Sequence, residues 1–427
     1  MDTYDNPVRG TWKALCERPS SDNSAVTAAV KEIIDKVKAG GDDALRSLSK
    51  QFDGLDLPSL EVSSAEIEEA AATVSGSLKE AIEMACRNIR AFHSAQIPVP
   101  VKVSTMEGVS CFQKPVPINR VGLYIPGGTA PLFSTVLMLA IPAKLAGCGE
   151  VILCTPPMRG SGKVAPAVLY AASICGVDRI FKAGGAQAVA AMAFGTESIP
   201  RADKIFGPGN QYVTAAKQLL GGRSVAIDMP AGPSEVLVIA DSTARPSFVA
   251  ADLLSQAEHG KDSQVMLVCT DKAVADAVAA EVTRQTALLG RAGFIESSLT
   301  KSRTVILSGR DDIVDFVNSY APEHLIISTD SPWEIADRIK AAGSIFIGNW
   351  SPESAGDYAS GTNHTLPTCG WASAYSGVNM DSFFKKITIQ ELSREGLASL
   401  SETIVTMAEN EGLQAHANAV KIRMNEK

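Results

Sequence analysis

Histidine is scarce in this chain, and four of its five copies lie in the last two-fifths of the sequence. Neutral imidazole is the commonest protein ligand of zinc-like metals, and it also titrates nearest to neutral pH. Carboxylate or amide side chains stand close to three of these histidines. The pattern predicts one shared site for metal binding and proton transfer, built from three polar stretches and one residue near the end: Gln256-Ala257-Glu258-His259, Pro322-Glu323-His324, Asp357 to His364, and His416.

The first of these stretches has helical spacing. Residues 251–260 are typical of an amphipathic helix that ends at Gly260. Gln256 and His259 are three residues apart, so both side chains share one helix face, where an amide oxygen and an imidazole nitrogen could hold an ion. A surface helix whose terminal histidine meets the helix dipole would give the same pattern. Taken alone, this motif favours that simpler interpretation.

The second stretch contains a carboxylate and an imidazole next to each other. Glu323 and His324 directly precede the apolar run 325–327, and neighbours within a strand point to opposite faces. Both can serve one site only if the chain bends, and Pro322 makes a bend credible. The pair would then suit proton transfer. An ordinary loop before a strand explains it equally well.

The third stretch is a long polar segment, residues 351–368, which follows a predicted strand. Loops of this length inside compact domains are usually functional or disordered. The low charge of the segment and the presence of Tyr358 argue against disorder, while Asp357 and His364 add an anionic ligand and a second imidazole. We therefore expect a functional loop. The remaining histidine, His93, lies on the apolar face of a predicted helix and is interpreted as a core residue.

The scaffold that must position these residues changes character along the chain. The first hundred residues have mostly helical periodicity, and from about residue 119 short apolar strands alternate with helix-length segments. This alternation predicts a mainly parallel sheet. The strands are expected at 121–125, 150–155, 179–183, 203–206, 235–240, 264–270, 303–308, 324–328 and 343–347.

A weak internal repeat suggests two related halves. The strand at 121–125, a Thr-Ala-Pro turn and the strand at 150–155 are echoed by the strand at 235–240, a Thr-Ala-Arg-Pro turn and the strand at 264–270. We predict an α/β fold with two incomplete Rossmann-like parallel-sheet domains, for which the repeat favours duplication, and small helical N- and C-terminal segments. The expected boundaries are an N-terminal arm at 1–21, a larger domain at 22–123 plus 236–380 that carries the metal and catalytic residues, a second domain at 124–235, and a helical arm at 381–427 that packs on its own body or on a partner subunit.

Glycine-rich turns follow three of the predicted strands, at 126–128, 184–185 and 207–209. In parallel sheets, ligands bind beyond the carboxyl ends of strands, so these turns could line a nucleotide cleft. The Gly-x-Gly-x-x-Gly fingerprint of dinucleotide sites does not follow any strand. Spacing alone therefore leaves tight turns as the simpler explanation.

Bulk composition excludes several classes of protein. The chain has 427 residues, of which 45% are apolar and 20% charged, and no run approaches the roughly 20 apolar residues of a membrane span. A net charge of −8 argues against a non-specific nucleic-acid binder. The acidic start lacks the features of a secretory signal, so we expect a cytoplasmic protein. Its eight scattered cysteines contain no Cys-x-x-Cys pair and are expected to be reduced and mostly buried.

Taken in order, the motifs resemble those of the histidinol dehydrogenase family over nearly the whole chain. They are Tyr124-Ile125-Pro126-Gly127-Gly128, Gly184-Gly185-Ala186-Gln187, Phe206-Gly207-Pro208-Gly209-Asn210, Asp228 to Glu235, Gln256 to Gly260, Pro322 to Leu325, and Ser354 to Tyr358. The resemblance implies a homodimeric zinc enzyme that oxidises L-histidinol through the aldehyde to L-histidine, with two NAD molecules, in the last step of histidine biosynthesis. The choice of NAD over NADP rests on this resemblance alone.

The resemblance also implies roles for particular residues. The zinc ligands would be Gln256, His259, Asp357 and His416, with His416 and Glu411 supplied by the C-terminal arm of the partner subunit. His324 would be the general base and Glu323 would activate water for the second oxidation. Tyr124, Gln187 and Asn210 would contact NAD. The substrate would contact Ser234, His364 and Glu411, together with Gln256, His259, Glu323, His324, Asp357 and His416.

Two other functions are compatible with parts of this pattern. One is a sister zinc-dependent NAD dehydrogenase that acts on another amino or sulfonated alcohol, and the other is a non-catalytic metal-binding dimer. The combination of Glu323 with His324 counts against the second. A set suited to a substrate with amine and imidazole groups, Ser234 with His364, Glu411 and His416, counts against the first. A covalent route through Cys111 or Cys154 is disfavoured because Glu323 is available to activate water.

Overall fold

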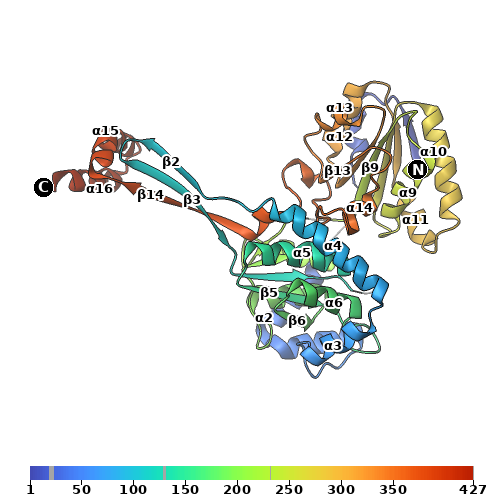
Figure 1. The fold of residues 1–427 in the computed structure, drawn as a ribbon, viewed down its shortest axis with the longest axis horizontal. Coiled ribbons are helices and arrows are strands. Elements are labelled where there is room, and N and C mark those ends of the chain that lie inside the picture. Colours follow the sequence, from blue (N-terminus) through green and yellow to red (C-terminus); the bar gives the residue numbers. More distant parts are fainter. Residues whose placement is uncertain (19–23, 128–130, 231, 427) are drawn as a thin grey trace.

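Two α/β lobes and one projecting arm make up the molecule (Figure 1). The computed structural model describes residues 1–18, 24–127, 131–230 and 232–426. Each lobe is built around a parallel sheet with helices on both faces, and the arm is an antiparallel ribbon that ends in two helices. No helix in these described ranges is long and apolar enough to cross a bilayer.

The larger sheet lies in the lobe that contains the start of the chain. Its strand order is β1-β11-β10-β9-β12-β13, and every pair is parallel. All residues of β9 and β10 are buried, as expected for strands covered on both faces. The strands are β1 (Asp2–Asp5), β9 (Glu235–Ala240), β10 (Gln264–Cys269), β11 (Arg303–Ile306), β12 (His324–Ser328) and β13 (Ser344–Ile347).

Helices cover this sheet on both faces. One core holds the inward faces of α9 (Pro246–Ala257), α10 (Lys272–Thr286) and α11 (Ala292–Leu299). The opposite core holds those of α1 (Trp12–Leu15), α12 (Arg310–Tyr320) and α13 (Pro332–Ala336). The alternation of strands and helices predicted from the sequence is therefore confirmed in this lobe.

The second sheet has the order β6-β5-β4-β7-β8 and is also parallel throughout. Its strands are β4 (Arg120–Tyr124), β5 (Glu150–Thr155), β6 (Arg179–Lys182), β7 (Lys204–Phe206) and β8 (Ala226–Ile227). Strands β9 to β13 follow the same order in the larger sheet, β11-β10-β9-β12-β13. This shared connectivity supports the predicted duplication.

The second lobe takes its helices from both ends of its sequence segment. One face is covered by α5 (Phe133–Ala146) and α6 (Pro166–Cys175), and the other by α7 (Gly185–Phe194) and α8 (Gln211–Leu220). The N-terminal helices α2 (Ser24–Asp53), α3 (Ser64–Thr73) and α4 (Gly76–Ser94) complete these two layers. Helix α2 is kinked at Gly41, whose φ of 49° suits glycine.

The expected domain boundaries differ from this packing at the N-terminal side. Residues 22–123 were expected in the larger domain, but the apolar stripe of α2, including Val30 and Val37, packs in one core with Ile152 and Ile205 of the second sheet. The separate arm expected at 1–21 is also not observed in residues 1–18. There, β1 pairs with β11 at the edge of the larger sheet, and Trp12 joins its core. Periodicity had identified the helices correctly but carried no information about which sheet they cover.

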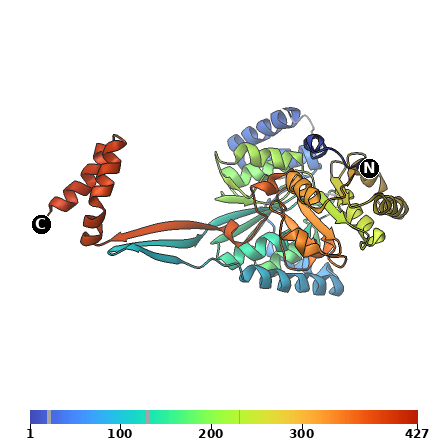
Figure 2. The same cartoon turned by 90° about the horizontal axis from the view of Figure 1, so that it is seen from above.

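The arm is an antiparallel sheet with the order β14-β3-β2, followed by α15 (Arg394–Asn410) and α16 (Gln414–Asn425). Strand β2 (Val101–Met106) and strand β3 (Val109–Pro117) leave the second lobe together, and β14 (Phe384–Leu392) runs beside them (Figure 2). Residues 381–427 were expected to be helical throughout, so β14 is a correction. Its Ile-Thr-Ile centre has the β-branched side chains typical of strands.

Candidate active site

The polar stretch at 351–368 links the two lobes. Asn363 Nδ2 donates to the Met138 carbonyl of α5 at 2.6 Å, and His364 Nε2 lies 3.3 Å from the Thr135 hydroxyl of the same helix. Asn363 Nδ2 also lies 3.3 Å from Nε2 of His93, which is fully buried and therefore has the core role expected for it. Asp357 and His364, the predicted site residues within this stretch, therefore lie near the contact between the two lobes.

A short helix inside this stretch arranges its acidic residues. The sequence predicted a loop, but α14 (Glu353–Tyr358) puts Glu353 and Asp357 one turn apart. Ligand atoms of His259, Glu353 and Asp357 all lie within 4.8 Å of one another. Among the described residues, Asp357 Oδ1 has no hydrogen-bond partner although it is buried. A cluster of this kind, in which an exposed imidazole lies beside buried carboxylate oxygens without hydrogen-bond partners in the described ranges, suits a divalent metal.

Gln256 contributes a further free oxygen. Helix α9 ends at Ala257, so His259 follows the last turn instead of lying within it. The Gln256 side chain is 1% exposed, and its Nε2 donates to the Glu235 carbonyl at 3.2 Å. Its Oε1 is buried and has no hydrogen-bond partner in the described part of the chain. The amide is therefore oriented with its nitrogen anchored and its oxygen available to a ligand.

The side chains of Glu323 and His324 lie close together, although the two residues are neighbours in the sequence. Ala321 adopts a left-handed conformation with φ 49°, which supplies the bend that Pro322 suggested, and β12 begins at His324. Glu323 Oε2 accepts the Glu235 amide proton at 2.8 Å and lies 3.7 Å from Nδ1 of His324. The two side chains therefore form a buried pair at the amino end of β12.

Burial and charge act together on this pair. Burial raises the pKa of the Glu323 carboxyl. For His324, burial alone would lower the pKa of the imidazole, but the nearby Glu323 and Glu353 carboxylates outweigh it, and the pKa is raised. A buried imidazole among carboxylates is a common arrangement for acid–base chemistry.

Two predicted substrate contacts lie at the same place. His364 Nδ1 lies 2.9 Å from the Asp357 carbonyl, and because a carbonyl only accepts, Nδ1 carries the proton of that hydrogen bond. Burial lowers the pKa of this imidazole. Ser234 is half-buried and immediately precedes β9, beside the main chain that contacts Glu323.

The predicted NAD contacts lie at the carboxyl edge of the second sheet. Tyr124 ends β4, Gln187 lies in the first turn of α7 after β6, and Asn210 precedes α8 after β7. The Tyr124 hydroxyl accepts the Gly185 amide proton at 3.1 Å, and burial raises the pKa of this phenol to about 12. Asn210 Oδ1 caps α8. Ligands of open parallel sheets bind at this edge.

Glu411 and His416 do not join this cluster within one chain. Both are exposed, and they lie around the junction of α15 and α16 at the far end of the arm (Figures 1 and 2). The site in a single chain therefore lacks two of its predicted members.

Comparisons with known proteins agree with the motifs. Residues 16–424 match the sequence model of the histidinol dehydrogenase family. A histidinol dehydrogenase from Bacteroides fragilis is 58% identical over 98% of each chain, and one from Salmonella typhimurium is 53% identical over 97% of this chain and 95% of its own. A crystal structure of histidinol dehydrogenase from Elizabethkingia anophelis has a TM-score of 0.97 at 52% identity, covering 99% of this chain and 98% of that one.

The chain belongs to the histidinol dehydrogenase family. Its match to the Elizabethkingia anophelis structure covers both lobes and the arm, so the fold described above is that of the family. The Cys154 thiol is fully buried, and burial raises its pKa, which leaves it unsuited to a covalent route. Cys111 lies in β3 of the arm ribbon.

Sequence reasoning missed four polar residues around this histidinol dehydrogenase site. Glu353 is 1% exposed, and burial raises the pKa of its carboxyl to about 8. Burial also raises the pKa of Asp252 to about 7, and the Asp252 carboxyl accepts the Glu353 amide proton. The spacing of Glu353 four residues before Asp357 was a usable signal. Arg18 and Glu235 are the other two. Glu235 ends one of the motifs that carry the resemblance, but no local pattern gave either residue a role.

Proposed function

We propose that this chain oxidises L-histidinol to L-histidine through the aldehyde, with two NAD+ consumed per substrate. The observation that carries the proposal is the buried pair Glu323 and His324, which lies beside oxygens of Gln256 and Asp357 that are unpartnered in the described structure. The similarity to histidinol dehydrogenases extends over nearly the whole chain. A metal-binding protein without catalysis would have no use for this buried acid–base pair.

His324 is proposed as the general base. Its Nδ1 lies 3.1 Å from Gln256 Nε2 and 3.2 Å from the Glu235 carbonyl, so the ring is held and Nε2 is left for the substrate. In the described part of the chain, this buried Nε2 has no hydrogen-bond partner. A metal ion on Asp357 would offset the carboxylates that raise the pKa of this imidazole, so that neutral Nε2 could take the hydroxyl proton of the alcohol in the first oxidation and of the aldehyde hydrate in the second.

Glu323 is proposed to activate the water that hydrates the aldehyde. Its carboxylate is oriented by the Glu235 amide at 2.8 Å and is buried, so its raised pKa makes it a stronger base than an exposed glutamate. Bound NAD+ supplies the hydride acceptor in both oxidations. Tyr124, Gln187 and Asn210 are proposed to hold it at the carboxyl edge of the second sheet.

Zinc fits the residues present. Gln256 Oε1 and Asp357 Oδ1 are buried without partners in the described chain, and His259 lies in the cluster with Asp357. Amide oxygen, carboxylate and imidazole are a hard-to-borderline donor set that zinc accepts. We propose one Zn2+ per subunit held by Gln256, His259, Asp357 and the partner's His416. The ion supplies a fixed Lewis-acidic point that orients the nitrogen atoms of the substrate.

A homodimer is proposed to complete the site. The arm holds Glu411 and His416 far from its own chain's cluster (Figure 1). Its strands expose apolar side chains to solvent, including Val101, Val103, Ile387 and Ile389. Exposed apolar surface of this kind is typical of an interaction site. Docking the arm on a second copy would bury this surface. It would also bring the partner's Glu411 and the partner's His416 to the substrate and the metal.

The test is the stoichiometry of the reaction in purified protein. We expect two NADH per L-histidinol consumed, loss of NADH formation on prior chelation, and recovery with zinc. Protein that holds zinc but forms no NADH from histidinol would contradict the proposal. It would point instead to a sister dehydrogenase that acts on another amino or sulfonated alcohol.

A further inference from the structure

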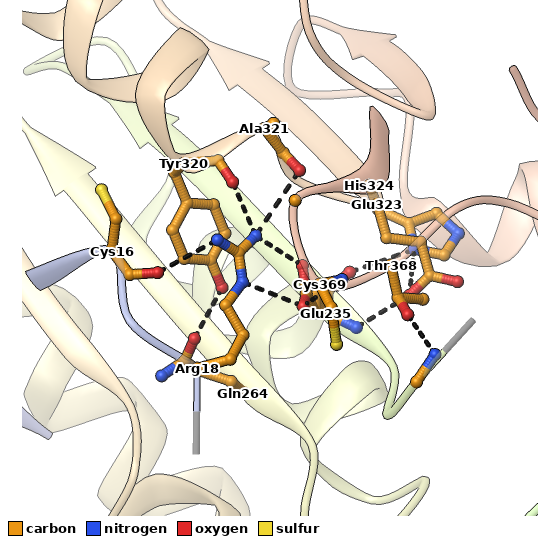
Figure 3. Close-up of polar contacts among 12 residues, drawn as sticks. Cys16, Arg18, Glu235, Gln264, Tyr320, Ala321, Glu323, His324, Thr368 and Cys369 are labelled. Carbon is orange, nitrogen blue, oxygen red and sulfur yellow. Dashed lines mark hydrogen bonds and ion pairs between the residues drawn. The ribbon is translucent and has the colours of Figure 1, made fainter. Parts of the chain in front are cut away.

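Arg18, in the N-terminal segment, lies beside Tyr320 and Glu235, and Glu235 separates it from the catalytic pair Glu323 and His324 (Figure 3). Its guanidinium donates two parallel hydrogen bonds to the Glu235 carboxylate, from Nε to Oε1 at 3.0 Å and from Nη2 to Oε2 at 2.9 Å. The Arg18 side chain is 15% exposed and that of Glu235 is 2% exposed. A buried, bidentate pair of this kind holds both partners in one geometry.

The main chain of Glu235 connects this ion pair to the catalytic residues. The Glu235 amide donates to Glu323 Oε2 at 2.8 Å. The Glu235 carbonyl lies 3.2 Å from both His324 Nδ1 and Gln256 Nε2. One residue therefore sets the position of the proposed water-activating carboxylate, the proposed base and a proposed zinc ligand. Arg18 in turn binds the side-chain carboxylate of Glu235 and so holds this residue in place.

Arg18 also holds the turn from which the catalytic pair emerges. Its Nη2 donates to the Tyr320 carbonyl at 2.6 Å and to the Ala321 carbonyl at 3.5 Å, and its guanidinium carbon lies 3.6 Å from the centroid of the Tyr320 ring. These carbonyls end α12, immediately before Pro322 and Glu323. The Tyr320 hydroxyl donates to Gln264 Oε1 at 2.8 Å, which ties the turn to β10.

We propose that Arg18 is a positioning residue for the Glu323–His324 pair. It fixes the pair from two sides, through the start of β9 and through the turn at the end of α12. The guanidinium is required because one planar group must satisfy a carboxylate and two carbonyls at once, which a lysine ammonium cannot do in the same place. Arg18 does not touch the reacting atoms. This inference rests on the proposed function, because it assigns Arg18 a role in that reaction.

The test compares steady-state kinetics of Arg18→Met and Arg18→Lys with wild type, per zinc-loaded folded subunit. Displacement of catalytic groups by about 1 Å costs on the order of a hundred-fold in rate. We therefore expect kcat to fall about a hundred-fold in Arg18→Met and about ten-fold in Arg18→Lys, which keeps the charge opposite Glu235. KM for histidinol and NAD+ should stay within about three-fold of wild type, because the side chains of Arg18 and Glu235 are not among the proposed substrate and NAD contacts.

Arg9→Gln is the matched control. Arg9 anchors the same N-terminal segment to α12, with its Nη2 at 2.5 Å from Asp312 and 2.8 Å from Asp315, and it forms no ion pair with Glu235 in the described structure. Arg9→Gln should leave kcat unchanged even if it lowers the melting temperature. A purely structural role for Arg18 would give fewer folded, zinc-loaded subunits with normal kcat in each.

The outcomes separate this inference from the proposed function. An active wild type with normal kcat per folded subunit in Arg18→Lys, and in Arg18→Met where it folds, would overturn the inference alone. Equal kcat losses in Arg9→Gln and Arg18→Lys would overturn it too, because anchoring of the segment would then be the cause. A zinc-loaded wild type that forms no NADH from histidinol would overturn the proposed function, and the inference with it.

Discussion

The imidazole Nε2 of His324 lies 3.5 Å from Oδ1 of Asp357, so the proposed base and a proposed metal ligand face each other across the site. They come from different elements, since His324 begins β12 and Asp357 lies on α14. The same imidazole is held from behind through Nδ1 by the Glu235 carbonyl at 3.2 Å. This arrangement places the base next to the metal site without requiring it to be a ligand.

The first prediction follows from this division of roles. His324→Asn should lower kcat at least about a thousand-fold, because the general base is lost. Its zinc content should stay at wild-type level, because the proposed ligands Gln256, His259 and Asp357 are untouched. Metal analysis of the dialysed variant beside its NADH assay gives both values. Loss of zinc together with activity would show that His324 is part of the metal site.

The second prediction concerns the metal ligands. His259→Asn should lose bound zinc and NADH formation together, because the imidazole lies in the ligand cluster with Asp357. Glu258→Gln is a suitable control, since it changes the adjacent residue, which is not in that cluster. Zinc per subunit after gel filtration measures the effect. Full zinc retention in His259→Asn would remove His259 from the proposed ligand set.

The third prediction tests the shared site. His259→Asn and His416→Asn should each be inactive as homodimers. In a mixed dimer, one site carries both substitutions and the other carries none. Random assembly on co-expression should therefore restore about a quarter of the wild-type activity, since half the dimers are mixed and each has one intact site. If His416 acted within its own chain, every site would carry a defect, and the mixture would stay inactive.

How far the sequence could predict this molecule depended on whether the signal was local. Each strand from β4 to β13 except the two-residue β8 was predicted, because buried parallel strands are continuous apolar runs such as Glu235–Ala240. Helix α2 was also recognised by its period, but its assignment to the wrong sheet shows the limit. An apolar stripe specifies that a helix is covered, and it does not specify by which partner.

The candidate site followed the same rule. His324 and Asp357 were found because rare residue types cluster in short polar stretches, and the family resemblance supplied their roles. Glu235 and Arg18 were missed, although the Arg18 guanidinium binds Glu235 directly. Arg18 and Glu235 are 217 residues apart, so no pattern in the sequence indicates that they are in contact. Only the fold shows that they meet, since β1 and α1 place the N-terminal segment beside the larger sheet.

The last prediction concerns pH and stability. Burial raises the pKa of Asp252 from 3.8 to about 7, so between these values the folded protein holds a proton that the unfolded chain releases. The contribution of Asp252 to the free energy of unfolding is therefore largest below about pH 4 and falls as the pH rises toward 7. Asp252→Asn should remove this loss, because the amide is uncharged and its oxygen can still accept the Glu353 amide proton.

We expect Asp252→Asn to melt a few degrees higher than wild type at pH 8, and to keep only about a third of that difference at pH 5, which lies about a third of the way from 3.8 to 7. Both proteins should be measured after chelation, so that pH-dependent zinc binding does not enter the comparison. Asp276→Asn is the control, because Asp276 is exposed and pairs with the exposed Lys272. A melting difference between Asp252→Asn and wild type that is the same at pH 5 and pH 8 would show that the Asp252 carboxyl does not titrate on unfolding in this range. The burial of Asp252 would then make no pH-dependent contribution to the free energy of unfolding.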